Sequence, residues 1–264
     1  MNVRKSVKVA AFGAAMLGLM VAPSLGRVAA QEATPEPVDL VTEMVPCGEW
    51  LGLGDETVAC VVILHLSPDA PAVDIWVNGA VAVPGLEYGK DTGYIALPAG
   101  DYAVAIAPAG AMASDADYSV DITLEAGMVY HAAAMGTLAA EDEAEFGVKL
   151  YERQVGAWEG EGTAIVEVIH ASTDAPSVDV ATKGGDAVIT DLVFGEVSDD
   201  LALPAGTYDL EVRPTGTMDV ALDLPGVALE AGKIYTVYAV GTLNADDEAE
   251  LGVHVVVTEQ KAGM

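Results

Sequence analysis

The chain has 264 residues, too many for one ordinary domain and enough for two domains of roughly 100–150 residues. It carries 41 acidic against 11 basic residues, a formal net charge of −30, although 52% of its residues are hydrophobic. Such an acidic surface repels nucleic-acid phosphates and anionic lipid headgroups, and the apolar content excludes a disordered chain. We therefore expect a folded, acidic protein that binds no nucleic acid.

Residues 1–30 predict a secretory signal peptide. Three basic residues precede an apolar run over 9–22, and small residues at 28–30 suit a cleavage site. An uncleaved anchor is the alternative, but a spanning helix needs about 20 apolar residues, and Pro23 ends this run early. Cleavage after Ala30 removes four bases and no acid, which leaves seven bases against 41 acids and a charge of −34. We expect a secreted or cell-envelope protein with no membrane segment after cleavage.

The only two cysteines are Cys47 and Cys60. In an exported chain this pair is most simply a disulfide, whereas a metal or redox pair would call for C-x-x-C spacing or further ligands nearby. We expect residues 31–57 to form an N-terminal extension that this disulfide tethers.

A duplication is the most informative feature of the sequence. The segment Val62–Asp74 recurs 105 residues later as Glu167–Asp179, and the turn Leu97–Gly100 returns as Leu203–Gly206 after a one-residue slip in register. A repeat of this length is a whole domain. The expected divisions are repeat 1 at 58–154, a Gly-rich linker at 155–162 and repeat 2 at 163–260.

Short β-branched runs between turn residues predict a β-sandwich or barrel in each copy. Comparing the copies separates core from surface, because strand side chains alternate between faces. Tyr102, Val104 and Ile106 stay apolar or aromatic in both copies and are expected in the core. The intervening residues are expected in water: Ala103, Ala105 and Ala107, with their counterparts Asp209, Glu211 and Arg213.

In the first strand, Val61, Ile63 and His65 are expected to point inward, because Val62 is replaced by Glu167 in the second copy. The outward set in repeat 1 is then apolar: Cys60, Val62, Leu64 and Trp76. Exposed apolar patches usually have a cover or a partner. We predict that residues 44–57 fold over this surface as a cap on repeat 1.

The motif H-x-S-[PT]-D-A-P-x-V-D occurs once per copy and contains the residues His65, Ser67, Asp69, Asp74, His170, Ser172, Asp174 and Asp179. A hydrolase centred on His65 and Asp69, or on His170 and Asp174, is one interpretation, and metal ligation is another. Ser and Asp in a Pro-rich turn normally bond their own backbone, and no G-x-S-x-G elbow is present. We therefore predict a structural turn, with no catalytic residue and no cofactor.

Acidic loops are a second candidate site, for calcium, and comprise Glu141, Asp142, Glu143, Asp246, Asp247 and Glu248. They lack EF-hand spacing, and closely spaced carboxylates are commonly a solvated face. The remaining histidines, His131 and His254, match Thr236 and Lys149 in the other copy, so no three-His zinc cluster is repeated.

The duplicated H-x-S-P-D-A-P-x-V-D motif, the G-x-x-Y-G at Gly85–Gly89 and the L-P-A-G-x-Y turns together resemble a bacterial secreted family, domain of unknown function 4397. The resemblance covers residues 58–258, once per copy. It implies an all-β fold of two tandem immunoglobulin-like or transthyretin-like antiparallel β-sandwiches outside the cytoplasm. It implies no catalytic residues.

Two functions stay open. The first is a non-enzymatic envelope or extracellular module that holds a protein or glycan through its loops or outer sheet faces, where outward alanines such as Ala103 and Ala105 would suit a flat contact. The second is an enzyme, with a hydrolase the obvious class; a calcium-binding surface protein is a further alternative.

Overall fold

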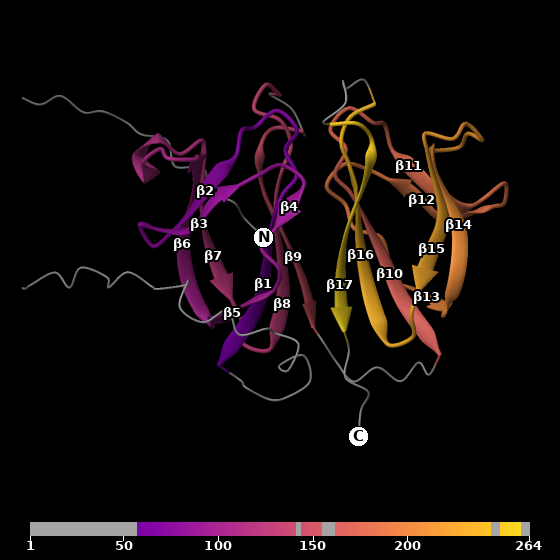
Figure 1. Cartoon of the computed structure of the whole chain (residues 1–264), viewed down its shortest axis with the longest axis horizontal. Coiled ribbons are helices and arrows are strands. Elements are labelled where there is room, and N and C mark those ends of the chain that lie inside the picture. Colours follow the sequence, from indigo (N-terminus) through magenta and orange to yellow (C-terminus); the bar gives the residue numbers. More distant parts are fainter. Residues whose placement is uncertain (1–56, 141–143, 155–161, 244–248, 260–264) are drawn as a thin grey trace, which may run out of the picture. The chain divides into compact units, whose positions relative to one another are not determined.

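The structure is a computed structural model that describes residues 57–140, 144–154, 162–243 and 249–259 (Figure 1). These residues all belong to one compact unit, Glu36–Met264. The expected signal peptide, most of the expected extension and the linker residues 155–161 lie outside the described residues. In the part of the chain that is described, no helix is long and apolar enough to span a membrane.

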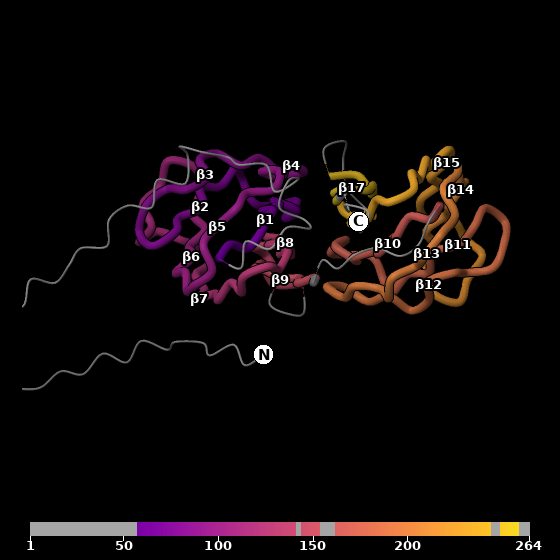
Figure 2. The backbone as a smooth tube through the Cα atoms, turned by 90° about the horizontal axis from the view of Figure 1, so that it is seen from below, coloured from indigo at the N-terminus to yellow at the C-terminus, as the bar shows by residue number. Residues whose placement is uncertain are grey.

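The first repeat consists of two sheets that face each other across a core (Figures 1 and 2). One sheet has the order β4-β1-β8-β9, with β5 also paired to β1, and the other has the order β3-β2-β6-β7. A 3-10 turn, η2 (Ala113–Asp115), follows β6. The strands are β1 Val58–His65, β2 Val73–Val77, β3 Ala80–Leu86, β4 Lys90–Asp91, β5 Ile95–Pro98, β6 Gly100–Pro108, β7 Tyr118–Leu124, β8 Met128–Met135 and β9 Gly147–Gln154.

The second repeat has the same arrangement, with sheets of order β13-β10-β16-β17 and β12-β11-β14-β15. Its strands are β10 Thr163–His170, β11 Val178–Thr182, β12 Ala187–Leu192, β13 Leu201–Pro204, β14 Gly206–Pro214, β15 Leu222–Leu229, β16 Lys233–Val240 and β17 Gly252–Glu259. The expected fold of two tandem β-sandwiches is confirmed.

Strand pairing is antiparallel except at one place in each repeat. β1 pairs with β8 in parallel, and β10 pairs with β16 in parallel. A parallel pair needs a long crossover connection. Here the crossover contains all the strands of the opposite sheet, together with β4 and β5 in repeat 1 and β13 in repeat 2, which pair with the first strand of their own sheet.

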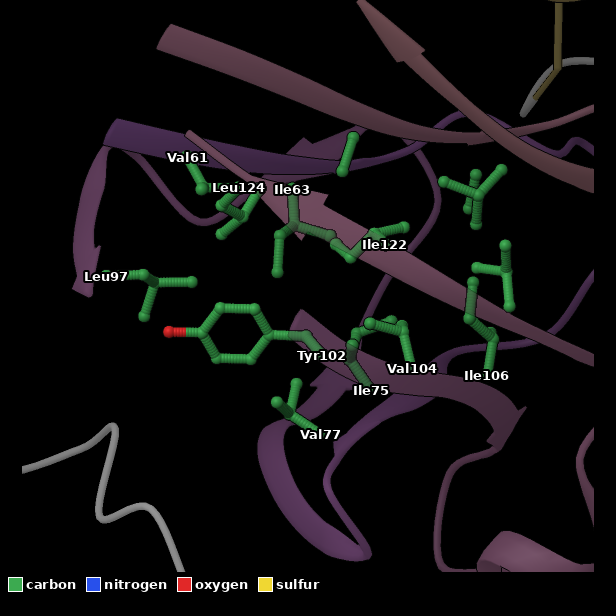
Figure 3. Close-up of a pocket in the computed structure, with 14 residues that line it drawn as sticks. Val61, Ile63, Ile75, Val77, Leu97, Tyr102, Val104, Ile106, Ile122 and Leu124 are labelled. Atoms are coloured by element: carbon green, nitrogen blue, oxygen red, sulfur yellow. The ribbon is translucent and has the colours of Figure 1, made fainter. Parts of the chain in front are cut away.

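The inward residues expected from the sequence form the two cores. Tyr102 and Ile106 are buried in repeat 1, and Val212 is buried in repeat 2. The core of repeat 1 contains an apolar cavity of about 40 Å³ (Figure 3). Ala132 and Val104 line it, and the Tyr102 hydroxyl beside it donates to the Pro98 carbonyl oxygen at 2.7 Å.

The expectation that the outer face of the β6 and β14 strands lies in water is wrong at three positions. Ala107, Glu211 and Arg213 are all buried. Arg213 donates through Nε to Glu211 at 3.0 Å and through Nη1 to the Gly185 carbonyl at 3.0 Å. A buried charge is tolerated when it is paired and hydrogen-bonded. Strand alternation therefore predicted correctly that these side chains point away from the core, but it did not predict that they are shielded from water.

Cross-strand pairing shows why this face differs between the repeats. Trp76 lies opposite Ala105 in repeat 1, whereas Ala181 lies opposite Glu211 in repeat 2. The larger side chain of the pair therefore lies on β2 in repeat 1 and on β14 in repeat 2, and each is opposite an alanine. The outward alanines of repeat 1 do not form an open, flat surface, because Ala105 is half-buried and Ala107 fully buried.

Candidate functional site

The repeated motif begins where β1 ends, at a fully buried histidine. His65 Nε2 lies 2.9 Å from the Pro71 carbonyl oxygen, and the Ser67 backbone N–H donates to Nδ1 at 3.4 Å. Because Nδ1 accepts, Nε2 carries the proton and donates to Pro71. Burial lowers the pKa of His65, so the ring is neutral at physiological pH. The imidazole thus closes the turn that follows β1.

His170 repeats this contact in the second copy, with Nε2 2.9 Å from the Pro176 carbonyl oxygen and a pKa that burial also lowers. Its Nδ1 and the Ser172 hydroxyl are both buried, and neither has a hydrogen-bond partner among the described residues. The two copies therefore hold the turn through the same histidine Nε2 contact. They differ in the hydrogen bonds of the histidine Nδ1 and of the serine hydroxyl, although His and Ser occupy the same positions.

The first motif aspartate connects this turn to a distant loop. Asp69 accepts hydrogen bonds from the Leu138 and Ala139 backbone N–H groups at 2.9 and 3.2 Å, and Asp174 accepts from Leu243 at 2.7 Å. The loop that donates these hydrogen bonds turns back sharply, at Gly136 in the first copy. A Cβ on Gly136 would lie 2.4 Å from the Glu145 carbonyl oxygen. This close approach explains why the G-T-L sequence that occurs at 136–138 and again at 241–243 begins with glycine.

The second motif aspartate binds one strand and one further loop. Asp74 accepts from the Gly85 and Gly110 backbone N–H groups at 2.7 and 2.8 Å. Asp179 accepts from Asp191 at 2.8 Å and from Gly216 at 3.0 Å, and these bonds lower the pKa of its carboxyl group. Each copy of the motif therefore connects two loops and the end of one strand at the same end of its sandwich.

In the first copy, the hydrogen bonds do not connect the motif serine, histidine and aspartate as a nucleophile with its base and acid. The Ser67 hydroxyl donates to Asp69 at 3.3 Å, and both ring nitrogens of His65 are engaged by backbone atoms. A Ser-His-Asp triad needs serine bonded to histidine, and histidine bonded to the carboxylate.

The loops that the motif holds expose apolar side chains at equivalent positions. Met112 and Met218 are 65% and 68% exposed, and Leu138 and Leu243 are 43% and 44% exposed. Loops on a rigid scaffold are common places for binding residues. The expected calcium-binding carboxylates Glu141, Asp142, Glu143, Asp246, Asp247 and Glu248 lie outside the described residues. Within the described ranges, no three His, Cys, Asp or Glu side chains are grouped to hold a metal ion.

The outward apolar face of β1 is buried, and part of it packs against the second repeat. Val62 and Leu64 pack in one cluster with Ile169 and Tyr238 of the second repeat. The second repeat therefore packs against these two positions. Cys60 is 5% exposed beside Val129, while Cys47 and nearly all of the expected cap lie outside the described residues, so the disulfide and the cap stay predictions.

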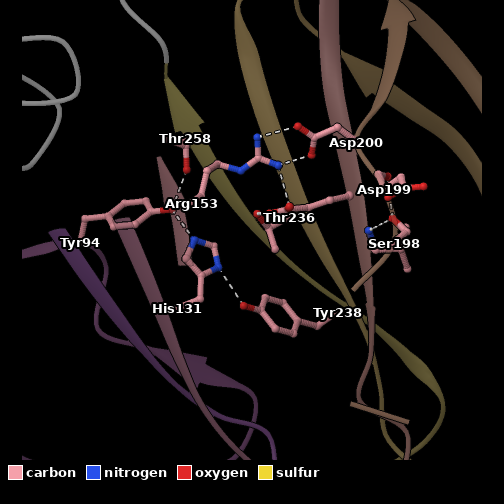
Figure 4. Close-up of polar contacts among 11 residues, drawn as sticks. Tyr94, His131, Arg153, Ser198, Asp199, Asp200, Thr236, Tyr238 and Thr258 are labelled. Carbon is pink, nitrogen blue, oxygen red and sulfur yellow. Dashed lines mark hydrogen bonds and ion pairs between the residues drawn. The ribbon is translucent and has the colours of Figure 1, made fainter. Parts of the chain in front are cut away.

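Around this apolar cluster lies a set of polar contacts between the repeats that sequence reasoning missed (Figure 4). The Tyr94 hydroxyl lies 2.7 Å from His131 Nε2 and 2.5 Å from the Thr258 hydroxyl, and His131 Nδ1 lies 2.8 Å from the Tyr238 hydroxyl. Burial, and secondarily the nearby Arg153 charge, lowers the pKa of His131 to about 4. Burial raises the pKa of Tyr94 to about 12. Both rings are thus uncharged at neutral pH.

Charged contacts also connect the two repeats. Together with the apolar cluster and the polar contacts just described, they form what we call the joint between the repeats. Arg153 of β9 forms ion pairs with Glu167, at 2.6 Å, and with Asp200 (Figure 4). Asp200 belongs to the segment after Ser198, which the sequence suggests is only a strand-entry turn. His254 of β17 lies 2.8 Å from Asp91. The available signal was the pattern of outward positions at which the copies differ in charge, such as Val62 against Glu167.

Comparison with known families gives one match. The model of a family described as "Domain of unknown function (DUF4397)" matches residues 59–181 and 164–263, once for each repeat. No curated protein matches the chain.

Two solved structures match parts of the chain at low scores. The Bacillus anthracis TIE protein matches with 14% identity and a TM-score of 0.21, over 70% of this chain and 34% of that one. A Parabacteroides distasonis protein described as "Putative cell adhesion protein" matches with 10% identity and a TM-score of 0.19, over 78% of this chain and 100% of that one. This chain thus spans about a third of the Bacillus anthracis protein, and similarity at these scores carries no argument about function.

Proposed function

The chain belongs to the DUF4397 family, and we propose that it is a non-enzymatic β-sandwich module that binds a protein or glycan outside the cytoplasm. One observation carries the proposal: the polar groups of the repeated motif bind backbone groups of their own domain, most of them in loops. Residues that hold loops in place are typical of a scaffold for binding. The signal-like residues 1–30 support the location.

The proposed contact surface is the loop end of each sandwich. Met112 and Met218 are the most exposed of its apolar side chains, and flexible methionines adapt to the shape of a protein partner. Because the motif holds the same loops in both repeats, the chain offers two such surfaces. A chain with a charge of −30 favours a basic or neutral partner over an acidic one.

A binding experiment on the loop end tests this proposal. We expect the double variant Met112→Ser and Met218→Ser to lose binding to envelope fractions of the producing cells, digested with protease or with glycosidase to distinguish the ligand classes. The matched control is Val81→Ser with Val188→Ser, two apolar side chains with exposures of 39% and 44% on strands near the opposite ends of the sandwiches. Equal binding by both double variants would contradict the loop end as the contact surface.

A second experiment separates the module from a hydrolase. Ser67→Ala with Ser172→Ala removes the hydroxyl at the one serine position that both copies of the motif share. We expect no hydrolysis of chromogenic esters, amides or glycosides by the wild type above the uncatalysed rate, and unchanged ligand binding by the variant. Turnover that the wild type shows and the double alanine variant loses would establish the hydrolase instead.

A further inference from the structure

The joint between the repeats is built from equivalent faces of the two copies. Tyr94 occupies the position of Asp200, because each precedes the strand that pairs with the first strand of its repeat. Arg153 occupies the position of Thr258, 105 residues later. The contact of Tyr94 with Thr258 therefore has a counterpart in the contact of Asp200 with Arg153. The two contacts are related as in an isologous, two-fold interface.

The apolar centre of the joint follows the same rule. Leu64 and Ile169 are equivalent residues, and so are Ala133 and Tyr238. All four are fully buried in one shared cluster. Each repeat thus contributes the same patch, from the outer faces of its first strand and of the strand parallel to it.

The side chains around this centre differ between the repeats in a complementary way. Repeat 2 brings the acids Glu167 and Asp200, and repeat 1 brings the base Arg153, which bonds to both. Two copies of repeat 2 facing each other would bring four carboxylates together with no arginine, since Thr258 replaces it. Two copies of repeat 1 would bury two arginines opposite Tyr94, without an acid at either position. Like charges brought together without an opposite charge repel each other, so the mixed pair is favoured at these positions.

We propose that this face is a heterotypic recognition surface, and that its partner in another molecule is the opposite repeat of a second copy of this chain. Repeat 1 of one copy would bind repeat 2 of the other through the contacts seen within the chain. The linker supplies only a high local concentration, which favours pairing within one chain over pairing between chains.

Cleavage of the linker in the folded chain tests the proposal. A protease site replaces residues within 155–161, and the full-length protein is cut after folding. Two preparations are used, one with a C-terminal affinity tag on repeat 2 and one untagged and isotopically heavy. We expect the cut halves to co-elute as a 1:1 complex. After the two cut preparations are mixed in equal amounts, tagged repeat 2 should retain light and heavy repeat 1 in equal amounts, and no heavy repeat 2. Separation of the halves, or capture of heavy repeat 2, would overturn the proposal.

A charge reversal and its rescue test the residues assigned to specificity. Arg153→Asp should weaken the association of the cut halves at least about 30-fold, the factor for ~2 kcal/mol expected when a partly buried charge pair is broken. Adding Asp200→Arg should restore most of the affinity, which a merely misfolded single variant would not show. The matched control is Lys183→Asp, which makes the same charge change at an exposed pair with Asp223. Unchanged affinity in Arg153→Asp, or no rescue, would refute the assignment.

Discussion

The cavity in the first core offers a quantitative test of how the two repeats are packed. Ala132 lines this cavity of about 40 Å³. The equivalent residue of repeat 2 is the larger Val237, which packs against the core of that repeat. The change Ala132→Val introduces into repeat 1 the side chain that repeat 2 already has. It adds two carbon atoms at a position where space exists.

The expected gain follows from burial. Each buried methylene contributes about 0.8 kcal/mol, so two contribute about 1.6 kcal/mol. Fixing the valine side chain costs about 0.5 kcal/mol, which leaves a net stabilisation of about 1 kcal/mol. For a cooperative unit of roughly 200 residues, this raises the melting temperature by about 2–4 °C.

Calorimetry of the full-length protein measures this shift, with urea unfolding as an independent measure. The reverse change Val237→Ala is the matched control, and it should create a cavity in repeat 2 and cost about 2 kcal/mol. If Ala132→Val instead lowered the melting temperature, the space beside Ala132 would be too small or wrongly shaped, and the packing argument would be refuted.

Four further predictions concern loops, charge and the N-terminal extension. Asp69→Ala leaves two backbone N–H groups without their acceptor and should cost about 1–3 kcal/mol by urea unfolding, whereas Ser67→Ala should cost less than half as much. The pKa of His131 is about 4 in the folded state and 6.5 in the unfolded state, so only the unfolded state gains a proton between these values. Stability should therefore fall by about 3 kcal/mol as the pH decreases from 6.5 to 4, and His131→Thr should flatten this slope in pH-dependent unfolding. Because the net charge of −30 repels itself, the melting temperature should rise between 10 mM and 500 mM salt, on the order of several degrees; no rise would contradict the repulsion. Finally, Cys47→Ser should lower the melting temperature of repeat 1 if residues 44–57 form the expected cap, and an unchanged transition would argue against that cap.

Much of the fold could be predicted because the chain contains the same domain twice. Comparing Tyr102 with Tyr208, and Ala103 with Asp209, separated inward from outward positions without any structure. The candidate site was harder to predict. The sequence identified His65 and Asp69 as motif residues, but Asp69 binds the backbone of Leu138, 69 residues away, and backbone acceptors leave no signal in side-chain identity.

By itself, the sequence determined the duplication, the all-β class, the inner and outer faces of the strands and the positions of the turns, because alternation and turn chemistry are local properties of the chain. Only the tertiary structure decided what covers each outer face. Val62 and Leu64 are buried by the second repeat, and Glu211 is buried with Arg213. Burial of an outward residue depends on which distant surface packs against it, and that is a property of the folded chain.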